Sequence, residues 1–343
     1  MKEMRIRISN MRVVTAALAI ALLGCDHDSA TERKLDLVRV ARSTFLTNAP
    51  ILIADEEGYF AREGIRIEYM EIPLNSVQAL PPLQRGDVDV VAATTSIGLL
   101  NGVASGAAFR IVADRGYVDP TSCEASGVIG RGSLFKGKTI DAALLRGRTV
   151  STNPVGHTGY MLSRYLEHYG LTLKDVKIVR LAPNVELQAM HSGGIDMVTR
   201  NDPYMHALLK DGDTLLAGAK MLVPNTNAAV LVYGPDFLVK NRELGLRFMK
   251  GYLRGVRQYN LGHTPRNLDV ISRRLGIAPA DLSEMCWPST RPDGAIDDNT
   301  LADYQRWAVT TGQLKEVASA SKLIDTTFAS QASRLLDSET RAR

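Results

Sequence analysis

Cysteine is scarce in this chain, with three among 343 residues. Cys25 ends an apolar run near the N-terminus, which leaves Cys123 and Cys286 for the rest of the protein. In an oxidising compartment two cysteines allow one disulfide, and two separate half-buried thiols are the equal alternative. The chain has no cluster of cysteine and histidine, so we expect no metal site.

Familiar catalytic motifs are missing as well. The sequence contains no G-x-S-x-G and no H-E-x-x-H, the patterns of an activated serine and of a zinc protease. An enzyme would need a nucleophile with its base, or a metal cluster, and neither is evident. We therefore expect no enzyme activity and no cofactor.

The sequence also lacks an apolar run long enough to span a bilayer, which takes about 20 residues. The uncharged run from Val13 to Gly24 is too short for this, follows four basic residues and has the layout of an export signal over residues 1–24. The run ends in Leu22-Leu23-Gly24-Cys25, which resembles a bacterial lipobox, in which the cysteine thiol receives diacylglycerol. The alternative is an ordinary cleaved signal, which also predicts export.

Asp26 resembles the residue that retains lipoproteins on the inner membrane of Gram-negative bacteria. We therefore expect a periplasmic protein held to that membrane by lipid, with residues 25–34 as a polar tether.

The chain without its export signal also lacks an excess of charge of one sign. Removal of residues 1–24 changes the balance of basic and acidic residues from 41 against 37 to 37 against 36. A nearly neutral protein without a basic block gives no reason to expect nucleic acid as a partner.

Short β-rich runs alternate with helical runs along the remaining chain. This order predicts an α/β fold with mostly parallel sheets flanked by helices on both faces, and the length favours two lobes. We assign residues 35–122 and 228–343 to lobe 1 and 126–226 to lobe 2, with helices following residue 238. A helix is expected over 51–64, and another is expected to begin at Pro81 and Pro82.

Polar residues gather at corners where strands lead into helices: 43–48, 94–96 and 153–158. Ligands of open α/β sheets bind at such corners, although Ser, Thr and Asn there also cap helices. His157 begins a helix, whose dipole favours a neutral ring with one donor and one acceptor. Asp202 could hold a ligand or cap the helix after Pro203. Arg115 and Tyr117 could meet an anion, but a solvated loop is the preferred interpretation for both.

The segment NAPILIADEEGYFAREGIRIEYMEI (48–72) resembles periplasmic binding proteins of the family that serves transporters of nitrate, alkanesulfonates, taurine and thiamine-precursor pyrimidines. The family pattern P-x-x-x-A-x-x-x-G-Y-F-x-x-E-G is matched by Pro50, Ala54, Gly58, Tyr59, Phe60, Glu63 and Gly64. Weaker matches, at 83–94, 190–204 and 310–332, extend the resemblance over most of the chain.

This resemblance implies a type II periplasmic-binding-protein fold with added C-terminal helices, which closes on a small molecule and delivers it to an ABC importer. The expected partners are separate permease and ATPase subunits, and we expect a monomer. The family's enzyme relatives, which make a thiamine pyrimidine, carry a cysteine-rich motif that is absent here. A sensory or scaffolding lipoprotein remains the alternative. The expected ligand contacts are Phe45, Thr47, Asn48, Thr94, Thr95, Ser96, Asn153, His157, Thr158, Asn201, Asp202 and Asn227.

Overall fold

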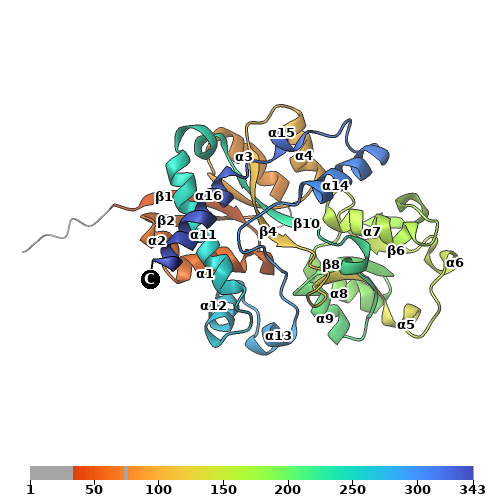
Figure 1. The fold of residues 1–343 in the computed structure, drawn as a ribbon. Coiled ribbons are helices and arrows are strands. Elements are labelled where there is room, and N and C mark those ends of the chain that lie inside the picture. The colour runs from red at the N-terminus through yellow and green to blue at the C-terminus, as the bar shows by residue number, and fades with distance from the viewer. Residues whose placement is uncertain (1–33, 73–75, 343) are drawn as a thin grey trace, which may run out of the picture. The chain divides into compact units, whose positions relative to one another are not determined.

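The computed structural model describes residues 34–72 and 76–342. The expected signal (1–24), Cys25, Asp26 and nearly all of the tether therefore lie outside the described residues. Residues 35–343 form one compact unit, which contains two sheets with helices packed on both (Figure 1). Within the described ranges, every helix is too short or too polar to cross a membrane.

The first sheet has five strands in the order β2-β1-β3-β10-β4. Strands β1 and β2 pair in parallel from Asp36 with Ile65 to Arg42 with Glu71, and β1 also pairs in parallel with β3. Only β10, which returns from the second sheet, runs antiparallel to its neighbours. The strands are β1 (Asp36–Arg42), β2 (Ile65–Glu71), β3 (Val90–Thr94), β4 (Arg110–Tyr117) and β10 (Asn227–Tyr233).

The second sheet repeats this plan in the order β7-β6-β8-β5-β9. Here β5 is the antiparallel strand, between β8 and β9, whereas β6 pairs in parallel with β7 and β8. The strands are β5 (Ser126–Gly130), β6 (Thr149–Ser151), β7 (Lys177–Val179), β8 (Met197–Asn201) and β9 (Thr214–Gly218). The expected mostly parallel sheets are thus confirmed, each with one antiparallel strand. Strand β9 was not expected from the sequence.

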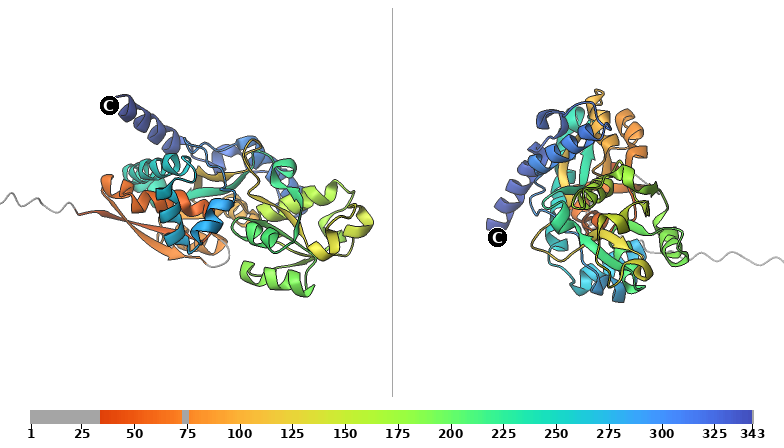
Figure 2. Two further views of the ribbon diagram at one scale, coloured as in Figure 1. Left: turned by 90° about the horizontal axis from the view of Figure 1, so that it is seen from below. Right: turned by 90° about the vertical axis from the view of Figure 1, so that its right-hand side faces the viewer.

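Helices cover both faces of the first sheet, and we call this assembly lobe 1. Successive side chains of β1 point to opposite faces of the sheet, so that Val40 packs with one helical layer and Ala41 with the other. Helices α11 and α16 lie side by side on the first of these faces (Figure 2). The helices of lobe 1 are α1 (Ala49–Glu56), α2 (Tyr59–Arg62), α3 (Leu80–Arg85), α4 (Ile97–Ala104), α11 (Arg242–Tyr259), α12 (Pro265–Leu275), α13 (Pro279–Glu284), α14 (Asp298–Thr310), α15 (Ala320–Leu323) and α16 (Thr327–Arg341).

The second sheet and its helices form lobe 2. Val150 and Met197 pack with α7 on one face, whereas Ile129 and Val198 pack with α8 and α9 on the other. The residue bounds of the two lobes stay a prediction, because residues 35–343 are one compact unit. The helices are α5 (Gly132–Phe135), α6 (Ala142–Leu145), α7 (His157–Glu167), α8 (Pro183–Ser192), α9 (Tyr204–Lys210) and α10 (Ala219–Leu222).

The expected helix over 51–64 was wrong in one respect, because the structure divides it into α1 and α2. Gly58 separates the two helices with a φ of 67°, a left-handed conformation that glycine adopts at little cost. The turn aims Tyr59 at the Gln258 side-chain oxygen, to which its hydroxyl donates, and Phe60 stacks on Phe248 at 4.9 Å between ring centroids. These contacts give the GYF motif a structural role, since they join α2 to α11.

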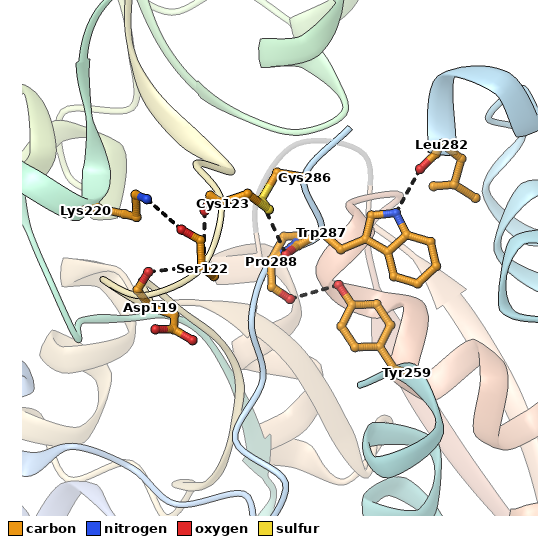
Figure 3. Close-up of a disulfide and its surroundings, with 9 residues drawn as sticks. All are labelled: Asp119, Ser122, Cys123, Lys220, Tyr259, Leu282, Cys286, Trp287 and Pro288. Carbon is orange, nitrogen blue, oxygen red and sulfur yellow. Dashed lines mark hydrogen bonds between the residues drawn. A yellow bond between two sulfur atoms is a disulfide. The ribbon is translucent and has the colours of Figure 1, made fainter. Parts of the chain in front are cut away.

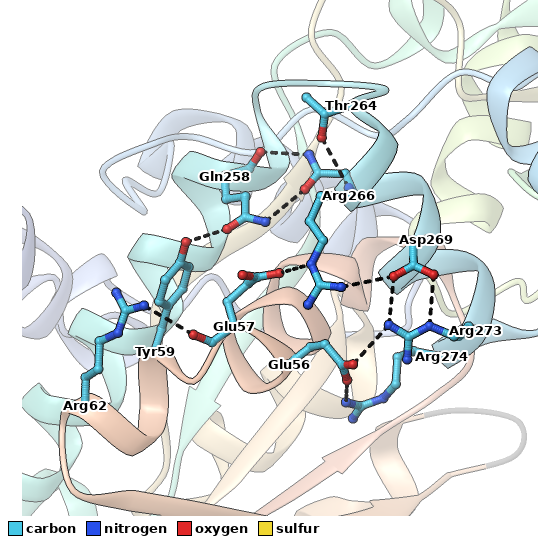
Figure 4. A network of polar contacts seen from close by, with 11 residues as sticks. Glu56, Glu57, Tyr59, Arg62, Gln258, Thr264, Arg266, Asp269, Arg273 and Arg274 are labelled. Carbon is cyan, nitrogen blue, oxygen red and sulfur yellow. Dashed lines mark hydrogen bonds and ion pairs between the residues drawn. The ribbon is translucent and has the colours of Figure 1, made fainter.

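Ion pairs tie α12 to the C-terminal end of α1 (Figure 4). Arg266 contacts Glu57 at 2.6 Å, and Arg273 and Arg274 contact Glu56 at 3.0 and 3.1 Å. Side chains of α1, α12 and α13 also share an apolar cluster that includes Ile53, Ile271 and Leu282. These contacts fix α13 to lobe 1. The segment that follows α13 meets the end of β4, where the Tyr117 N–H donates to the Ser289 carbonyl over 3.0 Å.

Candidate functional site

A cavity of about 150 Å³ is lined by residues from both sheets and from the segments that join them. Its wall includes Thr47 and Thr94 of lobe 1 and Arg200 and Asn201 at the end of β8 in lobe 2. The lobes touch beside it, where the His157 backbone N–H donates to the Thr95 carbonyl over 3.2 Å. The residues expected at a ligand site that do line the cavity are Phe45, Thr47, Thr94, Asn153, His157, Thr158 and Asn201.

Three other expected ligand contacts are buried behind this wall, and all lie in lobe 1. The Thr95 hydroxyl donates to the Asn227 carbonyl over 2.5 Å. The Asn227 amide donates to Asp114 over 2.6 Å, so both residues join strands instead of contacting the cavity. Ser96 caps α4, because its oxygen accepts from the Leu99 N–H over 3.4 Å, as the capping interpretation allowed.

Asp202 and Asn48 also do not line the cavity. Asp202 is 1% exposed and accepts from the His206 N–H over 2.8 Å, so it caps the start of α9. Burial raises the pKa of its carboxyl to about 7. Asn48 is fully buried and donates to the Ser43 carbonyl over 2.7 Å.

Arg115 and Tyr117 are not in a solvated loop, which corrects the preferred interpretation of the sequence. Strand β4 extends to Tyr117 because its pairing with β10 continues as far as Asn227. Tyr117 therefore lines the cavity, and Arg115 is fully buried beside Thr47.

The hydrogen bonds of Arg115 all go to neutral oxygens. Its guanidinium donates to the Thr47 hydroxyl over 2.7 Å, to the Asn48 side-chain oxygen over 2.9 Å and to the Ala93 carbonyl over 2.9 Å. The Nε atom is buried without a partner among the described residues. Burial lowers the pKa of the guanidinium to about 10, so it stays charged at neutral pH.

His157 is neutral in the folded protein, because burial lowers the pKa of its ring to about 4. The ring was expected to be neutral because of the helix dipole, whereas desolvation is the cause here. Nε2 lies 2.7 Å from the Thr226 hydroxyl oxygen, and that hydroxyl lies 2.7 Å from the Val223 carbonyl. A carbonyl can only accept, so Thr226 donates to Val223 and His157 Nε2 donates to Thr226. Nδ1 is then the acceptor atom of this ring.

Sequence reasoning missed the segments that cross between the lobes. Residues 117–126 lead from the end of β4 to the start of β5, and most of these ten positions line the cavity. Lys220 lines the cavity as well, and its ammonium donates to the Ser122 carbonyl over 2.6 Å. The polar composition of 117–126 was the available signal, but it equally suits a solvent-exposed loop.

Cys123 and Cys286 form a disulfide with a Cα–Cα distance of 5.8 Å (Figure 3), so the structure has the first of the two alternatives. The bond joins the first crossing segment to the residues that follow α13. The Tyr259 hydroxyl donates to the Pro288 carbonyl over 2.9 Å, and the Trp287 indole donates to the Leu282 carbonyl over 3.0 Å. Pro288 and Ser289 are thereby held in the cavity wall.

Known proteins resemble this chain in sequence or in fold. A putative aliphatic sulfonates-binding protein of Bacillus subtilis (strain 168) is 24% identical over 261 residues, 71% of this chain and 72% of that protein. The alkanesulfonate-binding protein of Xanthomonas axonopodis pv. citri, solved with MOPS bound, superposes with a TM-score of 0.67 and 18% identity over 86% of this chain and 99% of that chain.

A desulfurization enzyme, DSZB, also superposes, with a TM-score of 0.62 and 14% identity over 88% of this chain and 99% of that one. The likeness to the solved structures establishes the type II periplasmic-binding-protein fold, which binding proteins and an enzyme share. Residues 47–263 match the model of the family described as NMT1/THI5 like. The chain belongs to the NMT1/THI5-like family.

Proposed function

We propose that this chain is the extracytoplasmic solute-binding protein of an ABC importer and that its ligand is a small organic anion of the sulfonate type. One observation carries the proposal. A fully buried arginine, whose hydrogen bonds all go to neutral oxygens, lies directly behind a cavity enclosed by both lobes. A buried charge is costly unless it is paired. The buried Asp114 carboxylate offsets part of this cost, because it also acts on the guanidinium, and a bound anion would supply a second counter-charge.

Thr47 connects the charge to the cavity. A guanidinium only donates hydrogen bonds, so the Thr47 oxygen accepts from Arg115 and its own hydrogen is available for another acceptor. Its methyl group is confined, because a Cβ added to Gly116 would lie 3.0 Å from Thr47 Cγ2. A ligand oxygen in the cavity is the acceptor that we propose. Two further ammonium hydrogens of Lys220 could serve the same anion, although this ammonium also interacts with Glu124, a carboxylate of the same wall.

The ligand also carries a hydrogen-bond donor in this proposal. The His157 ring lines the cavity and its Nε2 is used on Thr226, which leaves Nδ1 to accept. An amine or hydroxyl group on the ligand would satisfy it. The cavity volume of about 150 Å³ equals that of a protein cavity that holds benzene, so the ligand is small.

Transport is supported by the family and by the two-lobed fold, in which a ligand that contacts both lobes favours the closed form. We further propose that Cys25 carries lipid and keeps the receptor beside a permease in the inner membrane. The sensory or scaffolding alternative predicts the same ligand but another partner. Co-purification of a permease and an ATPase with the cross-linked receptor would decide between the two.

An enzyme resembling the desulfurization enzyme is the less favoured reading. Cys123 is the cavity-lining cysteine, and its sulfur is bonded to Cys286. While this disulfide is intact, the described residues of the cavity wall therefore include no thiolate that could act as a nucleophile. Product formation from a sulfonate or sulfinate by the purified chain would reverse this assignment.

The first test combines mass spectrometry of co-purified ligand with thermal shifts against sulfonates, carboxylates and neutral sulfones. A ligand that binds only the folded state, supplied at about 100 times its dissociation constant, stabilises it by about 2.7 kcal/mol. We expect stabilisation by small sulfonates, and more by those with an amine or hydroxyl group. Stabilisation by neutral sulfones alone would contradict the anion proposal.

A further inference from the structure

Two helices from different lobes bring three metal-ligating side chains together. His206 lies on α9 of lobe 2, and Asp281 and Glu284 lie on α13 of lobe 1. One nitrogen and two carboxylate oxygens of these residues all lie within 4.8 Å of one another. We propose that they bind a divalent transition-metal ion such as Zn²⁺, which links the lobes. The proposal is independent of the ligand in the cavity.

His206 provides the observation that points to a ligand. Its Nε2 atom is buried and has no hydrogen-bond partner among the described residues, although Glu284 Oε2 lies 3.8 Å away. Buried polar atoms nearly always have a partner. One imidazole and two carboxylates form a donor set that suits zinc.

The three groups must move closer together to bind one ion. Zinc bonds to nitrogen and oxygen are about 2.0–2.2 Å long, so ligand atoms around one ion are closer than the 4.8 Å limit seen here. Asp281 and Glu284 side chains are 40% and 60% exposed and are free to change rotamer. Rotamer changes of these two side chains are therefore the movement that we propose.

Lys210 is the competitor for this site. Its ammonium lies 2.7 Å from Asp281 and 3.9 Å from Glu284, and its side chain is 57% exposed. Exposed ion pairs contribute little stability, and a lysine side chain has a long flexible stem. A divalent ion therefore displaces this ammonium, and removal of Lys210 strengthens metal binding.

Both helices are anchored in their own lobes. Leu282 of α13 packs with Leu46 and Ile53, whereas Met205 of α9 packs with Ile129 and Val198. An ion held from both sides favours this arrangement of the lobes. A cavity ligand that needs the same arrangement then binds more tightly in the presence of metal, and the effect is reciprocal.

The test uses the full chain, purified in mild detergent, treated with chelator and kept free of reductant. Zn²⁺ is titrated calorimetrically, and Co²⁺ by its visible absorption. We expect one ion per chain. His206→Ala and Glu284→Ala should each weaken binding by about tenfold or more, and Lys210→Ala should tighten it.

His191→Ala is the matched control, because His191 pairs with Asp211 within lobe 2 and tests for adventitious binding there. It should leave the affinity unchanged. Circular dichroism checks that each variant folds, and His206→Gln provides a second variant of similar size. Undetectable binding, or binding unaffected by His206→Ala and by His206→Gln, would overturn the proposal. Weaker binding in Lys210→Ala would do the same.

Discussion

The guanidinium of Arg115 donates a 2.7 Å hydrogen bond to the hydroxyl oxygen of Thr47. Arg115 is fully buried, whereas Thr47 belongs to the cavity wall. A positive charge therefore lies one side chain away from the ligand space, and it fixes the direction in which the Thr47 hydroxyl can donate. This contact provides the most specific test of the ligand's charge.

Thr47→Val keeps the shape of the side chain and removes its hydroxyl. Hydrogen bonds to charged groups contribute about 1.5–3 kcal/mol, so we expect anion affinity to fall by about tenfold to a hundredfold. Thr47→Ser is the control and should retain most of the affinity. Calorimetric titration measures both, and equal loss in the two variants would argue against a role for the hydroxyl.

Arg115→Met removes the charge and keeps much of the volume. Stability should change little, because two effects oppose each other. The variant gains stability since it no longer buries a charge, and it loses stability since the Asn48 and Ala93 oxygens no longer have a donor. Anion affinity should fall by at least about tenfold, since one tenfold step is only about 1.4 kcal/mol. An unchanged melting temperature together with unchanged anion affinity would show that Arg115 does not act on the ligand.

The Cys123–Cys286 disulfide closes a long loop, whose ends are 163 positions apart in the sequence. Replacing both cysteines by alanine should reduce the free energy of unfolding by about 2–4 kcal/mol. Ligand affinity should fall too, because Pro288 and Ser289 follow Cys286 in the cavity wall. Denaturant unfolding with and without reductant checks this. Reductant should destabilise the wild type and leave the double variant unchanged.

The pH dependence of stability should reveal Asp202. Burial raises its pKa to about 7 in the folded protein, against about 3.9 in an unfolded chain. Between these values the folded state binds more protons, so this carboxyl lowers stability as the pH rises from about 4 to about 7. The non-titrating Asp202→Asn should gain stability relative to the wild type over that window, by at most about 1.4 kcal/mol per pH unit.

Urea unfolding of both proteins at several pH values measures this difference. Asp114 and His157, whose pKa values of about 6 and about 4 are also set by burial, titrate in both proteins and cancel. A difference that stays constant with pH would contradict a raised pKa for Asp202.

Cys25→Ala tests the proposed anchor. Without the thiol there is no lipid attachment, so the exported protein should move from the membrane fraction to the soluble fraction. Fractionation with labelled palmitate follows both the location and the modification. A protein that remains unlabelled and soluble with Cys25 intact would favour the ordinary cleaved signal.

The α/β class was predictable because the alternation of β-rich and helical runs depends on local pattern. The same reasoning could not reveal that β10 enters the first sheet between β3 and β4, since that pairing joins segments more than a hundred residues apart. Asn227 illustrates the consequence. It was expected at the ligand but is bonded to Asp114 across the pairing of β10 with β4.

The cavity residues were predictable where a strand leads into a helix, as at Thr47 and His157. Capping and ligand binding favour the same residue types, which is why Ser96 could not be told apart from Thr94 before the structure. Arg115 was misread for a different reason. Its position beyond a short apolar run suggested a loop, and only the long pairing of β4 buries it.

The most direct test of the central claim compares an anion with a neutral molecule of the same shape. Ethanesulfonate and ethyl methyl sulfone are titrated calorimetrically into the purified wild type and into Arg115→Met. We predict that the wild type binds one sulfonate at least about tenfold more tightly than the sulfone, and that Arg115→Met abolishes this preference. Equal affinity for the two compounds in the wild type, or no binding of the sulfonate, would contradict the account.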